Sequence, residues 1–206
     1  MLDERNNVTD TFNKTVRKVI NLEGGLSLDP DDRGNWSGGQ KGVGELRGTK
    51  YGISAMSYPH LDIASLTVDD AISIYRRDFW DAIGADSLPP ALAVVAFDTS
   101  INSGVGTAKR LLEQSNGNLL DFIGRRFLHY TDLKQWALYG RGWTRRFAEI
   151  VRLASQFSSE PGVPLERLLL AFGPDGNESV RAELPAGQDI IIRIKADGKR
   201  VYVRPD

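Results

Sequence analysis

The spacing of apolar residues changes once along this chain, near Ser158. That change limits which folds the chain can adopt. Before Ser158, apolar residues recur at helical spacing in one segment after another. Beyond it they alternate with polar residues, as Val180, Ala182 and Leu184 do. Alternation of period two is typical of strands that cover one face. The sequence therefore predicts a mainly α-helical body followed by a small C-terminal β appendage.

Proline and glycine divide the helical part into segments of ordinary length. We expect a polar, non-helical lead-in over residues 1–10, and an interruption at residues 139–142 where two glycines occur. A linker-like stretch follows Ser158, and an Asp197-Gly198 turn is expected to join two strands. The helices are predicted over residues 12–23, 68–80, 91–104, 107–114, 119–130 and 143–157. Thr67, with Asp70 three residues later, indicates a capping box at the start of the second helix. The third helix is apolar nearly all round, which predicts that it is the central buried helix.

The segment from Ser27 to Ser54 is rich in Gly, Asp and Asn and shows no sustained period. A connection of this length inside a compact domain is usually functional or disordered. Scattered apolar residues favour order, as a folded loop or short strands. These anchors are Leu28, Trp36, Val43, Leu46, Tyr51 and Ile53.

Composition excludes several classes of function. The 206 residues include no cysteine and only two histidines, so thiolate sites are absent and a histidine-based metal site lacks ligands. A formal charge of −1 gives no overall attraction to nucleic acid. The N-terminal residues lack the apolar stretch of a secretory signal, and no stretch is long and apolar enough for stable membrane insertion. We expect no metal, no cofactor and no nucleic-acid partner.

The first helical segment ends in an acid on its apolar side. Glu23 continues the stripe made by Phe12, Val16, Val19 and Ile20, and two glycines follow it as a helix stop. Apolar surroundings and the negative end of a helix both favour the protonated form of a carboxylic acid. Such a carboxyl can serve as a general acid. The alternative is an ordinary solvated glutamate at a helix end.

Four motifs in the same order resemble glycoside hydrolase family 108, the phage-type N-acetylmuramidases. The first is Glu-Gly-Gly at residues 23–25, followed by the aspartates and glycine of residues 29–34. The second is Gly-Thr-Lys-Tyr-Gly-Ile at residues 48–53. The third is Phe-Asp-Thr-Ser-Ile-Asn-Ser-Gly at residues 97–104, and the fourth is Gly-Arg-Gly-Trp at residues 140–143. The last two resemble the peptidoglycan-binding half that accompanies the catalytic half in this family.

The resemblance implies a lysozyme-like helical fold that hydrolyses the β-1,4 bond between N-acetylmuramic acid and N-acetylglucosamine. Under it, Glu23 is the catalytic proton donor to the leaving oxygen. Residues 1–88 would form the muramidase half and residues 89–157 the peptidoglycan-binding-like half. Residues 158–206 would be the linker and the β appendage.

A glycosidase also needs a carboxylate or a positioned water on the other face of the sugar. The insertion at residues 35–47 departs from the family pattern and leaves Asp29, Asp31 and Asp32 open as the second carboxylate, with Asp32 the best match. Thr49 could hold a water through its hydroxyl, which both donates and accepts. A threonine that only shapes a turn is the alternative.

Two residues are candidates for contacts with the sugars. The ring of Tyr51 could stack on a sugar face, although loop aromatics often plug a core instead. The amide of Asn102 suits an N-acetyl group, and a helix C-cap is its alternative role. The arginines of the last predicted helix indicate a solvent-exposed face more than a binding site.

The sequence thus predicts a monomeric peptidoglycan hydrolase, most simply a phage endolysin. We expect it to be made in the host bacterial cytoplasm and to reach the periplasmic cell wall after a separate protein permeabilises the membrane. A place in the virion is also compatible. The alternatives are a non-catalytic or virion-associated wall-binding protein, and a lytic transglycosylase, which uses one acid and no water.

Overall fold

The computed structural model describes the backbone of residues 2–157 and of four C-terminal strands, and the side chains of residues 10–157. The chain forms two compact units that divide between Ala82 and Ile83. The predicted fold class, a mainly α-helical lysozyme-like protein, is confirmed. The predicted assignment of separate roles to residues 1–88 and 89–157 stays a prediction.

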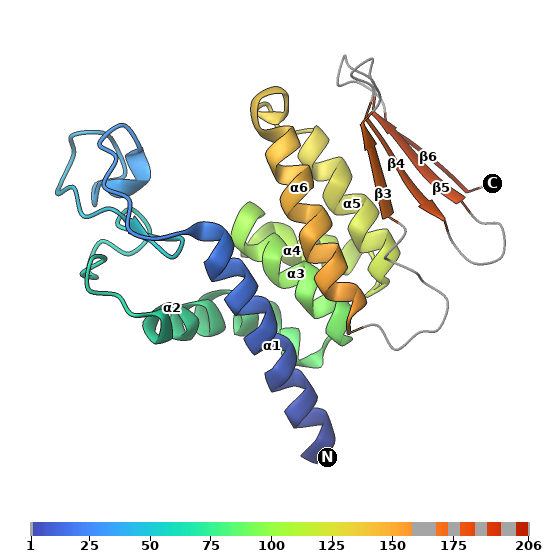
Figure 1. Ribbon diagram of the computed structural model, residues 1–206, viewed down its shortest axis with the longest axis horizontal. Coiled ribbons are helices and arrows are strands. Elements are labelled where there is room, and N and C mark those ends of the chain that lie inside the picture. Colours follow the sequence, from blue (N-terminus) through green and yellow to red (C-terminus); the bar gives the residue numbers. More distant parts are fainter. Residues whose placement is uncertain (1, 158–167, 173–177, 184–188, 195–200, 206) are drawn as a thin grey trace. The chain divides into compact units, whose positions relative to one another are not determined.

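The first unit consists of two helices and the Gly-rich segment between them (Figure 1). A short antiparallel hairpin lies in the second part of that segment and pairs Thr49 with Ser54. Helix α2 passes directly into a π-helical turn and then a 3₁₀ turn. The elements are α1 (Leu2–Glu23), η1 (Arg33–Asn35), β1 (Thr49–Lys50), β2 (Ile53–Ser54), α2 (Val68–Tyr75), η2 (Arg76–Trp80) and η3 (Asp81–Ile83).

The apolar stripe of α1 forms the core of this unit, as the sequence predicts. Its four residues are all at most 6% exposed. Phe12 packs edge-on against Trp80 at 5.2 Å between ring centroids, and the Arg76 guanidinium lies 5.2 Å from the Phe12 ring centroid. The expected capping box of α2 is also present, because Thr67 and Asp70 exchange side-chain and backbone hydrogen bonds.

The second unit contains four α-helices after a 3₁₀ turn. Helix α3 is the central one, because residues 91–100 are all buried, which confirms the apolar character predicted for this segment. Helices α4, α5 and α6 all contact α3. The elements are η4 (Ala85–Ser87), α3 (Pro90–Ser103), α4 (Val105–Gln114), α5 (Leu119–Thr131) and α6 (Trp136–Ser155).

Two helices are longer than predicted. Helix α1 begins at Leu2, so the expected non-helical lead-in was wrong. No glycine or proline occurs before Gly24 to stop that helix. Helix α6 begins at Trp136 and continues through the glycines that were expected to interrupt it. Gly140 is buried, and a Cβ atom there would lie 2.7 Å from the Trp136 ring. The glycine therefore serves close packing inside a helix.

The C-terminal strands form an antiparallel sheet in the order β3-β4-β5-β6. Three of them confirm the predicted alternation, and β3 was missed because its run of apolar residues does not alternate. The predicted linker after Ser158 and the Asp197-Gly198 turn lie outside the described residues. The strands are β3 (Leu168–Phe172), β4 (Glu178–Glu183), β5 (Asp189–Ile194) and β6 (Val201–Pro205).

Candidate active site

The end of α1 and the β1–β2 hairpin are joined by main-chain hydrogen bonds. Ser27 and Thr49 exchange two of them, with N–O distances of 2.8 and 3.0 Å, and the Tyr51 N–H donates to the Gly24 carbonyl at 3.3 Å. The strand that carries the Gly-Thr-x-x-Gly motif thus runs beside the residues that follow Glu23. The fold therefore brings together the first two motifs quoted above, which are more than twenty residues apart in sequence.

Glu23, the last residue of α1, is half-buried. Its side chain packs against Gly52 in the hairpin turn. A Cβ atom on Gly52 would lie 3.0 Å from Glu23 Cγ and 3.3 Å from its carboxyl carbon. Glu23 was predicted on the core-facing side of the helix, and it is less buried than the rest of that side. The helix ends at this residue, which is half-buried, whereas the other four residues of the stripe are buried.

The hairpin turn next to Glu23 has a backbone conformation that side chains rarely adopt. Tyr51 has φ +53° and Gly52 has φ +79°. The buried Tyr75 of α2 stabilises this turn by donating its hydroxyl to the Tyr51 carbonyl at 2.8 Å. Gly52 and Tyr75 were not predicted as site residues. Gly52 was visible as the second glycine of the motif, whereas nothing in the sequence links Tyr75 to the turn.

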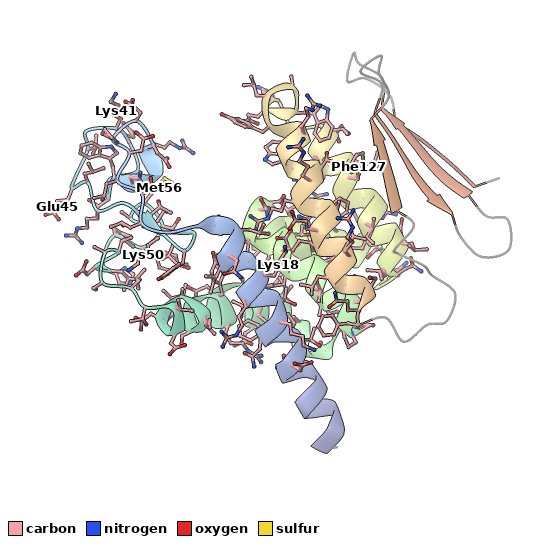
Figure 2. All side chains as sticks on the ribbon, in the orientation of Figure 1. Lys18, Lys41, Glu45, Lys50, Met56 and Phe127 are labelled. Atoms are coloured by element: carbon pink, nitrogen blue, oxygen red, sulfur yellow. The ribbon has the colours of Figure 1, made fainter. Side chains whose placement is uncertain are left out.

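The Gly-rich segment is a folded loop, as predicted. Of the predicted anchors, Ile53 is buried and Trp36 and Tyr51 are half-buried, whereas Leu28, Val43 and Leu46 are 37–50% exposed. Hydrogen bonds also hold the loop, several of them through the buried Asn35, whose carbonyl accepts from two backbone N–H groups and whose amide donates to Asp29 O at 2.9 Å. Figure 2 shows Lys41 and Glu45 on this segment and Lys50 on the hairpin.

The three candidate aspartates differ in how far their carboxylates are engaged. Asp31 forms an ion pair with Lys41. Asp29 accepts from the Asp31 N–H at 2.9 Å, and Asp32 accepts from the Gly34 N–H at 2.8 Å as the N-cap of η1. Asp32 is exposed, and its second oxygen, Oδ2, accepts no hydrogen bond within residues 10–157.

Thr49 and Tyr51 are both half-buried on the hairpin. The Thr49 hydroxyl makes no hydrogen bond to any described side chain or backbone group, so it is available to hold a water. The Lys50 ammonium lies 5.4 Å from the Tyr51 ring centroid, within cation–π distance, and donates to Ala64 O at 2.8 Å. Their assignment to the reaction stays a prediction.

Asn102 lies on α3 in the second unit, on the exposed side of a charged cluster. Its amide oxygen accepts from Arg146 Nε at 2.7 Å. Arg146 also donates to Asp98 at 3.0 Å, and Asp98 is ion-paired with the fully buried Arg126. Burial opposes the charge on Arg126, but attraction to Tyr130 and Asp98 outweighs it and raises the pKa of Arg126. Asn102 thus has a packing role in addition to its predicted sugar contact.

Neither a metal site nor a membrane span is found in the part of the chain that the structure describes. There, no three acidic or histidine side chains gather in a way that could hold a metal ion. None of the helices described combines the length and apolar character needed to cross a bilayer.

Two comparisons with known proteins bear on the site. The family described as Glycosyl hydrolase 108 matches residues 16–104, which include Glu23 and the hairpin. The solved structure of SagA from Brucella abortus is similar in fold, with a TM-score of 0.59 and 22% sequence identity, covering 74% of this chain and 98% of SagA. No curated protein matches this chain.

Proposed function

We propose that this chain, whose residues 16–104 belong to the glycosyl hydrolase 108 family, is an N-acetylmuramidase. Membership makes it a glycoside hydrolase of the peptidoglycan-degrading muramidase type. The finer assignment is hydrolysis of the β-1,4 bond between N-acetylmuramic acid and N-acetylglucosamine. The observation that carries it is the Glu23 carboxyl packed against the glycine turn of the hairpin, inside the matched segment.

Glu23 is the general acid of this proposal. It lies half-buried at the end of a helix, with its side chain against Gly52 of the hairpin turn, and in this scheme it donates its proton to the glycosidic oxygen. Protonation of that oxygen lets the sugar leave as the bond to the anomeric carbon breaks.

A water or a carboxylate then completes the reaction on the other face of the sugar. Asp32 is the proposed second carboxylate, because its place just before Gly34 best matches the family motif. Asp31 is ion-paired with Lys41, whereas Asp29 and Asp32 each accept one backbone N–H. Thr49 is proposed to orient the attacking water through its unengaged hydroxyl. No cofactor takes part in this scheme.

The test compares wild type with Glu23→Gln on bacterial cell walls. We expect wild type to clear a zymogram and the variant, which keeps the shape of the side chain but cannot donate the proton, to lose clearing by at least about a hundredfold. Mass spectrometry of the products should show reducing muramic acid ends. Equal clearing by both proteins sinks the acid assignment, and 1,6-anhydro ends would identify a lytic transglycosylase instead.

We further propose a phage-type lysis role for a monomeric enzyme made in the host cytoplasm. Export would then depend on a separate protein that permeabilises the membrane. The check is expression in a bacterium with and without such a pore-forming protein. Lysis only in its presence supports the endolysin role, and recovery of the protein in purified virions would favour a virion-associated enzyme.

A further inference from the structure

A cavity of about 420 Å³ opens in the first unit next to the proposed catalytic acid. Gly24, which follows Glu23 directly, lines it. Tyr51 also lines it and precedes Gly52, the residue in contact with the Glu23 side chain. The cavity therefore adjoins Glu23 in both segments. One lining residue follows Glu23 in the chain, and another precedes the residue that the Glu23 side chain contacts. Its lining residues are Arg17, Ile20, Asn21, Gly24, Tyr51 and Val68.

The lining follows from the periodicity of α1. Residues 17, 20 and 21 share one side of the helix, and Gly24 follows directly after the helix ends. Ile20 is 6% exposed and supplies an apolar base, whereas Arg17 and Asn21 are exposed and bring polar groups to the opening. Val68, at the start of α2, adds an apolar edge.

Among the residues that line the cavity, Arg17 alone is charged. None of its six lining residues is acidic, and Lys50 adds a second positive charge beside the Tyr51 ring. Arg17 forms no ion pair with any carboxylate in the part of the chain whose side chains are described. A guanidinium free to make two parallel hydrogen bonds, next to an amide donor, is suited to a carboxylate.

We propose that this cavity binds the carboxylate-bearing lactyl substituent of N-acetylmuramic acid, an inference that rests on the proposed function. Of the two sugars in peptidoglycan, muramic acid alone carries this group, either as a free carboxylate or extended by the stem peptide. Arg17 pairs with the carboxylate and Asn21 donates a further hydrogen bond. Ile20 and Val68 form the apolar surface for the methyl group of the substituent. The cavity thus fixes which sugar lies beside Glu23.

Binding by the Glu23→Gln protein separates this inference from the chemistry. Affinity is measured by calorimetry for glycan strands with stem peptides, for amidase-treated strands with free lactyl carboxylates, and for chitohexaose, which has neither. Adding Arg17→Gln should weaken binding of the carboxylate ligands by about tenfold or more and leave chitohexaose unchanged. Arg17→Lys should restore part of the loss, because it returns the charge but not the paired hydrogen bonds.

The control is Arg110→Gln, which removes the same charge from an exposed residue of α4 outside the cavity. A loss on amidase-treated strands supports the free lactyl carboxylate as the partner of Arg17, whereas a loss confined to intact strands overturns it in favour of a carboxylate of the stem peptide. Any of three results overturns the cavity assignment. These are equal losses of affinity for all three ligands, no loss for any ligand, and no binding of strands by the Glu23→Gln protein itself. Wild-type wall clearing in any of these cases leaves the proposed hydrolase function standing.

Discussion

Glu23 and Gly52 contact each other so closely that residue 52 has no room for a side chain. The space a Cβ atom would take on residue 52 lies 3.0 Å from Glu23 Cγ and also overlaps the Tyr75 hydroxyl. Glycine at this position therefore does two things. It permits a φ of +79°, and it lets the hairpin backbone lie against the proposed acid.

Replacing Gly52 with alanine should impair both stability and activity. The positive φ and the two collisions together should cost about 1–3 kcal/mol in the free energy of unfolding. Because the collision pushes on Glu23 itself, we expect wall hydrolysis to fall by about a hundredfold, as a displacement of about 1 Å does in other active sites. Urea unfolding and initial rates of turbidity loss measure the two effects.

Gly42→Ala is the matched control. Gly42 has nearly the same backbone conformation, φ +77°, but a Cβ atom there would meet nothing within 4 Å. It should lose about 1 kcal/mol through backbone strain and keep close to wild-type activity. Equal losses of activity in the two variants would mean that strain, and not contact with Glu23, explains the need for glycine at residue 52.

Arg126 should be far more important for stability than its neighbour in sequence. Its guanidinium and the Asp98 carboxylate are both fully buried, whereas Arg125 forms a half-exposed pair with Asp121. Arg126→Met leaves a buried carboxylate without its main partner and should cost about 3–5 kcal/mol. Arg125→Met should cost less than about 1 kcal/mol. Similar urea midpoints for the two variants would contradict this ranking.

Asp78 should make the first unit sensitive to acid. Hydrogen bonds from Arg77 lower the pKa of Asp78 against the opposing effect of burial, and the Tyr58 hydroxyl adds to the lowering with a bond of 2.8 Å. A lowered folded-state pKa gives stability that is present above the unfolded value of about 3.9 and is lost as pH falls through the folded value.

The measurement is the urea midpoint at pH 6 and at pH 3. Wild type should lose more of its midpoint than Asp78→Asn, which has no carboxyl to protonate at this position. The same contact raises the pKa of Tyr58, because burial and the nearby carboxylate both disfavour the phenolate. If the two proteins lose equal stability between pH 6 and pH 3, Asp78 is not a source of the acid sensitivity.

The features that depend only on the spacing of residues within one segment could be predicted from the sequence. The stripe of α1, the capping box at Thr67 and the apolar α3 each follow from spacing within one segment, and each is confirmed. The support of the hairpin by Tyr75 could not be predicted, because it joins residues 24 positions apart. The packing of Gly140 on Trp136 was missed for a related reason. A pair of glycines in a sequence usually indicates a helix end, and only the structure shows that the Trp136 ring fills the space beside Gly140.

The loop that carries Asp32 has a further consequence for how this enzyme can diverge. Its path depends largely on main-chain amide and carbonyl groups, together with the side chains of Asn35, Trp36 and Ser37. Exposed positions from 40 to 46 can therefore be exchanged without moving the backbone, provided the glycines with positive φ and Gly38, which has no room for a Cβ atom, remain. This part of the molecule can thus vary in sequence while Glu23 keeps its contact with Gly52.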